Sequence, residues 1–178
     1  ANGLLVLSAG NVYLSGITAN DNLDDGIDAE VYNGSSFKLA HSTLGDSVVT
    51  GNGDDGLDLE TDGSVSIYKV TAIGNDDNGV YVDASYGSGD LFVSHSNFSN
   101  NLDEGLEGYA ENITIKNVFT NNNGEYGLFL TALGEITLTR VTSNGNGFDG
   151  VDLLTIGNSK IICSTFQNND YGITADLL

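Results

Sequence analysis

The stretch ITIKNVFTNNNGEYGL, residues 113–128, contains every feature that repeats along this chain. It starts with an alternating apolar segment, passes through an asparagine-rich turn, and reaches Gly127 four residues after Asn123. A second alternating segment follows the glycine. Alternation with a period of two is typical of strands that bury one face. The stretch therefore predicts strand, turn and strand, and it leaves no room for a helix of ten residues.

The glycine of this unit recurs along the whole chain at intervals of 22 to 30 residues. Its copies are Gly3, Gly26, Gly56, Gly79, Gly105, Gly127, Gly150 and Gly172. An asparagine stands four residues before each of the last seven, namely Asn22, Asn52, Asn75, Asn101, Asn123, Asn146 and Asn168. A period of this length with two or three short strands per coil describes a parallel β-solenoid. Because parallel crossovers are overwhelmingly right-handed, the solenoid is expected to be right-handed as well.

Equivalent residues of successive coils are expected to lie above one another, about 4.8 Å apart. The turn asparagines can then hydrogen-bond to their copies in a ladder, which satisfies buried polar groups of the turn. The glycine is expected to supply a backbone conformation that a Cβ would forbid. We therefore predict an all-β fold, a right-handed parallel β-helix of about seven coils, with residues 1–178 as a single domain.

The repeat resembles that of the pectate-lyase-like superfamily of parallel β-helices, and it is similar to β-helix repeats of bacterial surface proteins. The resemblance covers essentially the whole chain and rests on units such as residues 113–128. It implies the fold but not one function, because that superfamily includes lyases, hydrolases, epimerases, phage tailspikes, adhesins and surface stalks.

The ends of the sequence fall inside coils. The segment Gly3–Asn11 aligns with Gly150–Asn158, and the chain stops just after Ile173–Asp176. Solenoids require caps over their terminal coils. We therefore expect either a segment of a longer solenoid or a subunit that stacks end to end through open strand edges.

Composition limits the partners and the compartment. The chain has 25 acidic residues against five basic ones, a net charge of −20, which excludes nucleic acids and anionic membrane surfaces as partners. It has no apolar run near 18 residues, so membrane insertion is not expected. Abundant Asn, Ser, Thr and Gly favour a secreted or cell-surface protein. The single cysteine, Cys163, excludes an intrachain disulfide, and its strand-like flank predicts a small core residue.

Acidic side chains recur in the turn before the glycine and on the strand after it. Carboxylates of neighbouring coils would lie about 5 Å apart, where each like-charged pair costs roughly 1 kcal/mol in a water-like dielectric. Bound Ca²⁺, a possible cofactor with six to eight oxygen ligands, would relieve this repulsion. A solvated acidic face is the alternative. Neither the nine-residue calcium-binding repeat nor the EF-hand loop is complete in this sequence. The candidate metal ligands are Asp24, Asp25, Asp28, Asp54, Asp55, Asp58 and Asp77.

A second set of candidates occupies the corner after the first strand of each coil. Lys69, His95, Asn117 and Arg140 align there, with His41 as a further candidate member beyond an inserted loop. The resemblance implies that a basic residue beside Ca²⁺ could abstract a proton, as in lyases. However, the Gly-His-Gly and Arg-Ile-Lys motifs of polygalacturonases are missing, and so is the pectate lyase signature around an Asp-His pair. The other reading of His95 is a corner residue that hydrogen-bonds the loop.

Aromatic residues are expected to point outward from both strands of the coil. Such side chains either stack against sugar rings or pack under a loop or a neighbouring subunit. They are Tyr81, Phe129 and Tyr109 after the glycine, and Tyr13 and Phe92 on the other strand.

Two functions remain open at this point. The regular repeat and short corners favour a non-catalytic structural or adhesive segment of an extracellular bacterial surface protein or filament, rigidified by calcium. The alternative is a polysaccharide-active enzyme, a lyase or glycoside hydrolase, or a carbohydrate-binding module, since paired carboxylates suit glycosidic hydrolysis. The longest insertion, near Leu44–Ser47, has only about seven residues, which argues against a walled cleft. No catalytic residue is assigned, and the expected partners are a surface glycan or further copies of the solenoid.

Overall fold

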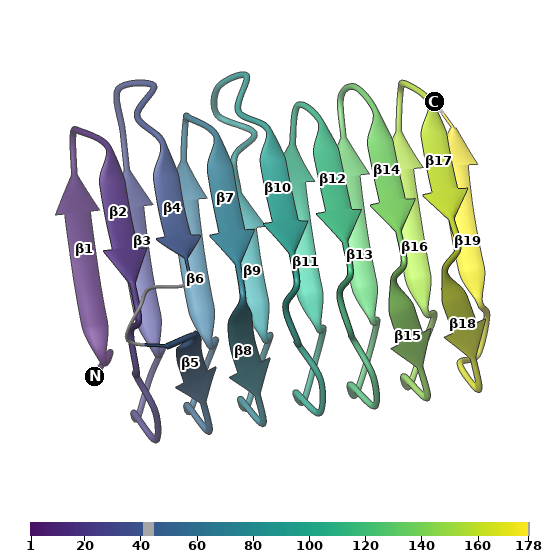
Figure 1. Ribbon diagram of the computed structural model, residues 1–178, viewed down its shortest axis with the longest axis horizontal. Helices are drawn as coiled ribbons and strands as arrows, with labels where there is room; N and C mark the ends of the chain where they lie inside the picture. The colour runs from purple at the N-terminus through teal and green to yellow at the C-terminus, as the bar shows by residue number, and fades with distance from the viewer. Residues whose placement is uncertain (41–44, 178) are drawn as a thin grey trace.

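The computed structural model describes residues 1–40 and 45–177 and consists of strands and connecting turns, with no helix in that part of the chain. Its coils stack side by side along one axis (Figure 1) and form a right-handed parallel β-helix of about seven turns. The predicted fold class is therefore confirmed. Within the described residues, no helix is long and apolar enough to cross a membrane.

Three faces run along the solenoid. The first is an eight-stranded parallel sheet, called sheet A here, and the second is a seven-stranded parallel sheet, called sheet B. Sheet A contains β1 (Leu4–Ser8), β3 (Ile27–Val31), β6 (Leu57–Thr61), β9 (Val80–Asp83), β11 (Leu106–Ala110), β13 (Leu128–Ala132), β16 (Val151–Thr155) and β19 (Ile173–Leu177). Sheet B contains β2 (Val12–Ser15), β4 (Phe37–Ala40), β7 (Val65–Tyr68), β10 (Leu91–Ser94), β12 (Ile113–Lys116), β14 (Ile136–Thr139) and β17 (Ser159–Ile162). The third face holds the short pairs β5 (Ser47–Thr50) with β8 (Val70–Ile73), and β15 (Thr142–Asn144) with β18 (Thr165–Gln167).

The register of sheet A follows the repeated glycine. The residue after each glycine pairs with its copy in the next coil, as Ile27 does with Leu57 and Leu128 does with Val151. Because the pairing is in register, the inward positions hold mainly apolar residues, and the outward side chains form columns along the sheet. The core is filled mainly by Val, Leu and Ile, with Phe37 and Phe98 as its largest buried side chains.

The predicted asparagine ladder is present, with one change. Each side-chain amide donates to the amide oxygen of the asparagine one coil further on, from Asn22 to Asn52 at 2.9 Å and onward to Asn146. The last member is Asn169, which accepts from Asn146 at 3.0 Å. The prediction of Asn168 was wrong because the last turn is one residue shorter before its glycine. Asn168 has a positive φ of 58° and directly precedes the ladder residue Asn169, just as Asn122, with φ 56°, directly precedes the ladder residue Asn123.

The repeated glycine is required by close packing between coils. A Cβ on Gly105 would lie 2.6 Å from the carbonyl oxygen of Gly127 and 2.7 Å from the side-chain amide of Asn123. The φ of Gly105 is not in the left-handed region. The glycine therefore serves mainly to let the backbone of one coil approach the ladder of the next, and the expected special conformation is not its reason.

The corner after sheet B is a left-handed turn whose residues form one column. Lys69, His95, Asn117 and Arg140 all have φ between 52° and 56°, which confirms their predicted alignment. Cys163 continues the column with φ 51° and is exposed, so its prediction as a core residue was wrong. Its neighbours are strand-like, but the corner ends the strand at the residue before it and turns its side chain outward. His41 and Leu44 lie outside the described residues.

Candidate functional site

A shallow groove of about 500 Å³ crosses the N-terminal ends of the central sheet A strands β6, β9 and β11 and the turns that lead into these strands and into β13. We call it the acidic groove. Nine of its eleven lining residues are acidic, and within the described residues no Lys or Arg lines it. Its lining is Asp54, Asp55, Asp58, Glu60, Asp77, Asn78, Tyr81, Asp103, Glu104, Glu107 and Glu125.

The repeat places these side chains together. Turn residues one and two positions before the glycine, such as Asp55 and Asp54, stack over their copies in the next coil. Outward residues two and four positions after it, such as Asp58 and Glu60, form parallel columns on sheet A. Side chains from coils that are two dozen residues apart in sequence therefore converge on one surface.

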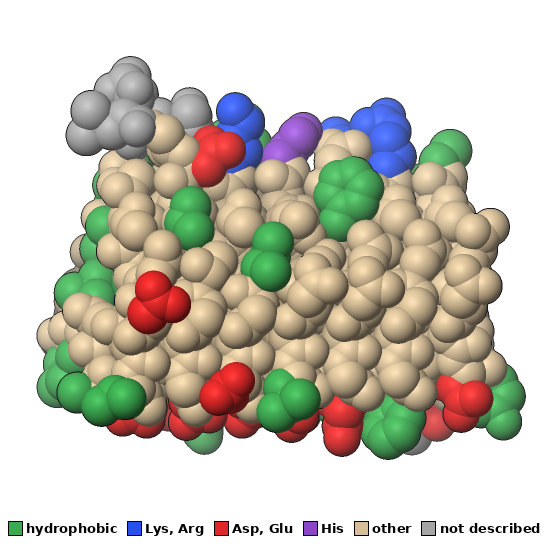
Figure 2. All heavy atoms as spheres, turned by 90° about the horizontal axis from the view of Figure 1, so that it is seen from below, with side chains coloured by type: hydrophobic (Ala, Val, Ile, Leu, Met, Phe, Trp, Pro, Cys, Tyr) green, Lys and Arg blue, Asp and Glu red, His purple; other side chains and the backbone are tan. Residues whose placement is uncertain are grey.

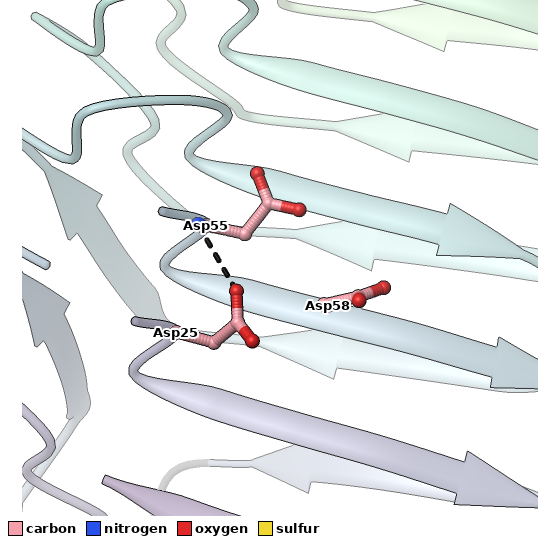
Figure 3. Close-up of side chains that lie close together, drawn as sticks. All are labelled: Asp25, Asp55 and Asp58. Atoms are coloured by element: carbon pink, nitrogen blue, oxygen red, sulfur yellow. Dashed lines mark hydrogen bonds between the residues drawn. The ribbon is translucent and has the colours of Figure 1, made fainter. Parts of the chain in front are cut away.

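Two carboxylate trios lie in and beside the groove. Asp25, Asp55 and Asp58 form one trio, and Asp54, Asp55 and Asp77 form the other, with carboxylate oxygens of each within 4.8 Å of one another. Figure 3 shows the first trio, in which the backbone N–H of Asp55 donates to Asp25 Oδ1 at 3.2 Å. Asp55 belongs to both trios. An oxygen-only set at these distances matches the donors that a hard divalent cation prefers.

Two of the seven predicted metal ligands lie outside the trios. Asp24 Oδ2 lies 3.7 Å from the N-terminal ammonium of Ala1. Asp28 Oδ2 accepts a hydrogen bond from the side-chain amide of Asn2 at 2.7 Å. The structure thus brings together five of the seven predicted residues, and Asp24 and Asp28 lie outside both trios.

Burial shifts the acidity of the groove. Loss of hydration is the main cause that raises the pKa of Asp55 to about 8 and that of Asp58 to about 7. The backbone N–H of Asn78 donates to Asp55 at 2.8 Å and acts in the opposite direction. Burial, followed by contact with Asp103, raises the pKa of Asp77 to about 7. Without a cation, the groove therefore holds protons at a pH where ordinary aspartates are ionised.

One carboxylate oxygen of the first trio has no partner. Asp58 Oδ1 is buried and accepts no hydrogen bond, whereas nearly all buried polar atoms in native proteins are satisfied. It belongs to the side chain that also faces Asp25 and Asp55. An oxygen in this position is suited to a ligand that the protein itself does not supply.

An aromatic column adjoins the acidic groove. Tyr81 lines the groove itself, and its ring centroid lies 6.2 Å from that of Tyr109. Tyr109 contacts Phe129 at 6.4 Å, Phe129 contacts Tyr126 at 5.3 Å, and Tyr126 contacts Phe148 at 5.3 Å. Four of these rings are half-buried against one another, while Phe148 is 44% exposed. Tyr13 and Phe92 are exposed on sheet B, as expected, and lie outside this column.

The basic corner column lies on the other side of the third face. Figure 2 shows acidic side chains gathered along one edge of that face and Lys, Arg and His side chains along the opposite edge. His95 Nε2 lies 3.1 Å from the Asn117 amide, which in turn accepts from Arg140 at 3.2 Å. A strand and a turn separate Lys69 from Asp77, so a basic residue of this column and the carboxylate trios do not meet in one centre. Among the described residues, the basic corner column therefore lies apart from the acidic groove.

Sequence reasoning missed the C-terminal half of the groove. Asp103, Glu104, Glu107 and Glu125 were not assigned as site residues, although they occupy the same offsets from the glycine as the aspartates that were. Those offsets are the signal that could have found them. Tyr81 was recognised as outward, but not as part of an acidic site.

Comparisons with known proteins agree with this fold. A family model described as "Right handed beta helix region" matches residues 55–176. A double mutant of the periplasmic alginate epimerase AlgG is similar in structure, with a TM-score of 0.73 and 15% identity, covering 99% of this chain and 46% of that one. A single mutant of the same epimerase gives a TM-score of 0.69 and 14% identity, covering 99% and 48%. This chain therefore spans just under half the length of those structures. A search of curated proteins gives no significant match.

Proposed function

The chain belongs to the right-handed β-helix family, and from that premise we propose that it is an exported polysaccharide-active protein. In this proposal a glycan chain lies in the acidic groove of sheet A and against the adjoining aromatic column. The proposal rests on one observation: the acidic groove and the aromatic column meet at Tyr81, which lines the groove and packs against Tyr109. Carboxylates accept hydrogen bonds from sugar hydroxyls, and aromatic rings cover the apolar face of a sugar.

The structural neighbours support this proposal at the level of the fold. The epimerase that resembles this chain is described as periplasmic and as acting on alginate, a polysaccharide. This description favours an exported carbohydrate-active protein over an adhesive filament. No basic residue is among the described lining residues of the groove. We therefore propose hydrolysis rather than the lyase reaction, which uses a basic residue to abstract a proton.

Calcium is the second part of the proposal. The trios that share Asp55 would hold the cation, and Asp58 Oδ1 would gain the partner that it lacks. When bound, Ca²⁺ would keep these carboxylates ionised and offer open coordination positions to sugar oxygens. Asp25, Asp54 and Asp77 complete the two sets of ligands.

The groove also contains a carboxyl outside the trios that is suited to acid catalysis. Glu104 has its pKa raised to about 8 by burial first and by the nearby charge of Glu107 second. A carboxyl that stays protonated at neutral pH beside other carboxylates is the arrangement that glycosidic hydrolysis needs. Glu104 would protonate the glycosidic oxygen as its bond to the anomeric carbon breaks. A neighbouring carboxylate such as Glu107 or Glu125 would take a proton from the water that forms the new bond to that carbon.

A non-catalytic solenoid stiffened by calcium is the second candidate. The observation that favours it is the column of like charges along successive coils, which Ca²⁺ would neutralise without any glycan. This candidate predicts a calcium-dependent stability with no retention of polysaccharides. The binding experiment below therefore separates the two candidates.

The experiment measures retention on a panel of polysaccharide gels by affinity electrophoresis, with Ca²⁺ and with a chelator. We expect retention on at least one polysaccharide in Ca²⁺ and weaker retention after chelation. Asp77→Asn is expected to weaken the binding at least about 10-fold, since a hydrogen bond to a charged group contributes about 1.5–3 kcal/mol and 1.4 kcal/mol corresponds to a factor of ten.

Asp170→Asn is the matched control. Asp170 stands two residues before Gly172, the same offset that Asp77 has from Gly79, but it is exposed and lies outside the groove. It is expected to bind like the unmodified chain. Absence of retention on every polysaccharide, or equal loss in both variants, would contradict the proposed function.

A further inference from the structure

A second hollow lies at the opposite end of the sheet A strands, where the chain passes from sheet A to sheet B. It has a volume of about 380 Å³ and is lined by Tyr32, Glu60, Thr61, Asp62 and Tyr86. We call it the tyrosine notch. Both tyrosines are unusually exposed, at 46% and 71%, and neither packs against another ring in the contacts of the described residues.

Unequal loop lengths create the notch. Residues 32–36 connect β3 to β4 and residues 84–90 connect β9 to β10, whereas only residues 62–64 connect β6 to β7 between them. Figure 1 shows the two longer loops rising on either side of the short one. Each long loop contributes one tyrosine, and the short turn forms the floor. The sequence-based expectation that short corners leave no walled site is therefore incomplete at this end of the sheet.

The walls of the notch are fixed by backbone contacts. A Cβ on Gly87 would lie 2.0 Å from the carbonyl oxygen of Asp62, and a Cβ on Gly63 would lie 2.1 Å from that of Ser35. The backbone N–H of Gly34 also donates to Asp62 Oδ1 at 2.7 Å. Such close contacts hold both long loops against the short turn, which is the preorganisation that a binding site needs.

The spacing of the walls suits one sugar ring. Coils two apart are separated by about 10 Å, since each step is about 4.8 Å. A ring held between two aromatic faces needs them about 7–8 Å apart, because carbon atoms contact optimally at 3.5–4.0 Å. A separation of about 10 Å between the two long loops is therefore wide enough to admit one sugar ring. The volume also falls within the range of small-molecule sites.

The charges of the notch select an uncharged sugar. Glu60 and Asp62 line it, and the Tyr32 hydroxyl donates to Glu30. No Lys or Arg is among its described lining residues. A uronate or sulfated sugar would be repelled by these carboxylates, whereas the hydroxyl groups of a neutral sugar can donate to Glu60.

We propose that the tyrosine notch binds one neutral pyranose residue of the glycan, with its ring between Tyr32 and Tyr86 and its hydroxyl groups on Glu60. This inference rests on the proposed function and narrows it. Glu60 lines both the notch and the acidic groove, so a single chain can occupy both. The substrate is then a polysaccharide with neutral hexose or pentose units.

The test uses the whole chain with Tyr86→Ala, Tyr86→Phe and the control Tyr13→Ala, which removes a similarly exposed tyrosine from sheet B. Dissociation constants are measured in Ca²⁺ for a soluble β-glucan, a galactomannan, a xylan, alginate and polygalacturonate. We expect binding to a neutral polysaccharide, weakened about 3- to 10-fold by Tyr86→Ala, as for loss of one aromatic contact. Tyr86→Phe should retain the stacking face and stay within about 2-fold, and Tyr13→Ala should have no effect.

Different failures point to different conclusions. If Tyr81→Ala weakens binding and Tyr86→Ala does not, the proposed function stands and the notch assignment is wrong. The same holds if the chain binds only the two polyuronates. If no polysaccharide is bound at all, both proposals are wrong. Circular dichroism of each variant verifies that the exposed substitutions leave the fold intact.

Discussion

Replacement of Asp55 by asparagine should make the protein more stable at neutral pH when no cation is present. Asp55 is only 8% exposed and belongs to both carboxylate trios. The chain already provides the precedent, because Asn78 occupies the same place in the next coil. Asn78 Oδ1 accepts the backbone N–H of Glu104 at 3.1 Å, as Asp55 Oδ1 accepts that of Asn78. Asp55→Asn can therefore keep the hydrogen bond and remove the buried charge.

The expected gain in the free energy of unfolding follows from the pKa of Asp55, which burial raises from 3.8 to about 8. A group that holds its proton more tightly in the folded state stabilises the fold below the unfolded-state pKa. That stability is lost as the pH rises from 3.8 toward 8. Between pH 4 and pH 7 the loss from Asp55 alone is roughly 4 kcal/mol, at 1.36 kcal/mol per pH unit. The asparagine of the variant does not ionise, so the stability of the variant should decrease less as the pH rises.

Thermal unfolding followed by circular dichroism measures this effect at pH 4 and pH 7, with a chelator and with millimolar Ca²⁺. In chelator at pH 7, Asp55→Asn should melt on the order of 10 °C above the unmodified chain. Ca²⁺ should raise the Tm of the unmodified chain and have little effect on the variant, because both trios lose a ligand. Asp170→Asn removes a carboxylate from an exposed turn position outside the trios and should behave like the unmodified chain.

Two results would refute this reasoning. A Tm of Asp55→Asn no higher than that of the unmodified chain at pH 7 in chelator would mean that burial of the charge carries no cost. An equal rise in the Tm of both proteins with Ca²⁺ would place any cation elsewhere.

Three further outcomes are expected. Asn101→Ala should lower the free energy of unfolding in urea by about 2–5 kcal/mol, because the buried backbone N–H and side-chain amide of Asn75 lose their acceptor. An equal free energy of unfolding would show that the ladder is not a stabilising element. Gly105→Ala should destabilise the chain by several kcal/mol or prevent folding, while Gly10→Ala, whose Cβ meets nothing within 4 Å, should leave the Tm nearly unchanged. Glu104→Gln should retain binding to the polysaccharide and lose the release of reducing ends by at least about 100-fold, and retained turnover would exclude Glu104 as the general acid.

The fold could be predicted from sequence because the repeat fixes the register. Once the glycine and its asparagine are aligned, every inward and outward position of sheet A follows from alternation, as the pairing of Ile27 with Leu57 confirms. The prediction failed in the last turn, which is one residue shorter, and at the end of β17, where the corner begins one residue earlier than the strand-like flank indicated. Asn169 replaces Asn168 in the last turn, and Cys163 falls on a corner instead of a strand.

The candidate site could be predicted only in part. Columns of carboxylates follow from the repeat, and Asp54, Asp55 and Asp77 were found in this way. The partners of Asp24 and Asp28 in the first coil were not visible in the repeat pattern. The tyrosine notch depends on the conformation of two loops that have no equivalent in the other coils. Periodicity carries no information on the direction of side chains in such loops.

The proposed function places the glycan on the acidic and aromatic side of sheet A. Hydroxyl-radical labelling with mass spectrometry, with and without the bound polysaccharide, locates it, because exposed aromatic rings are oxidised on every face. We expect the polysaccharide to protect Tyr81, Tyr126 and Phe148, and to leave Tyr13 and Phe92 on sheet B as reactive as before. Protection of Tyr13 and Phe92 with no change at Tyr81 would contradict it.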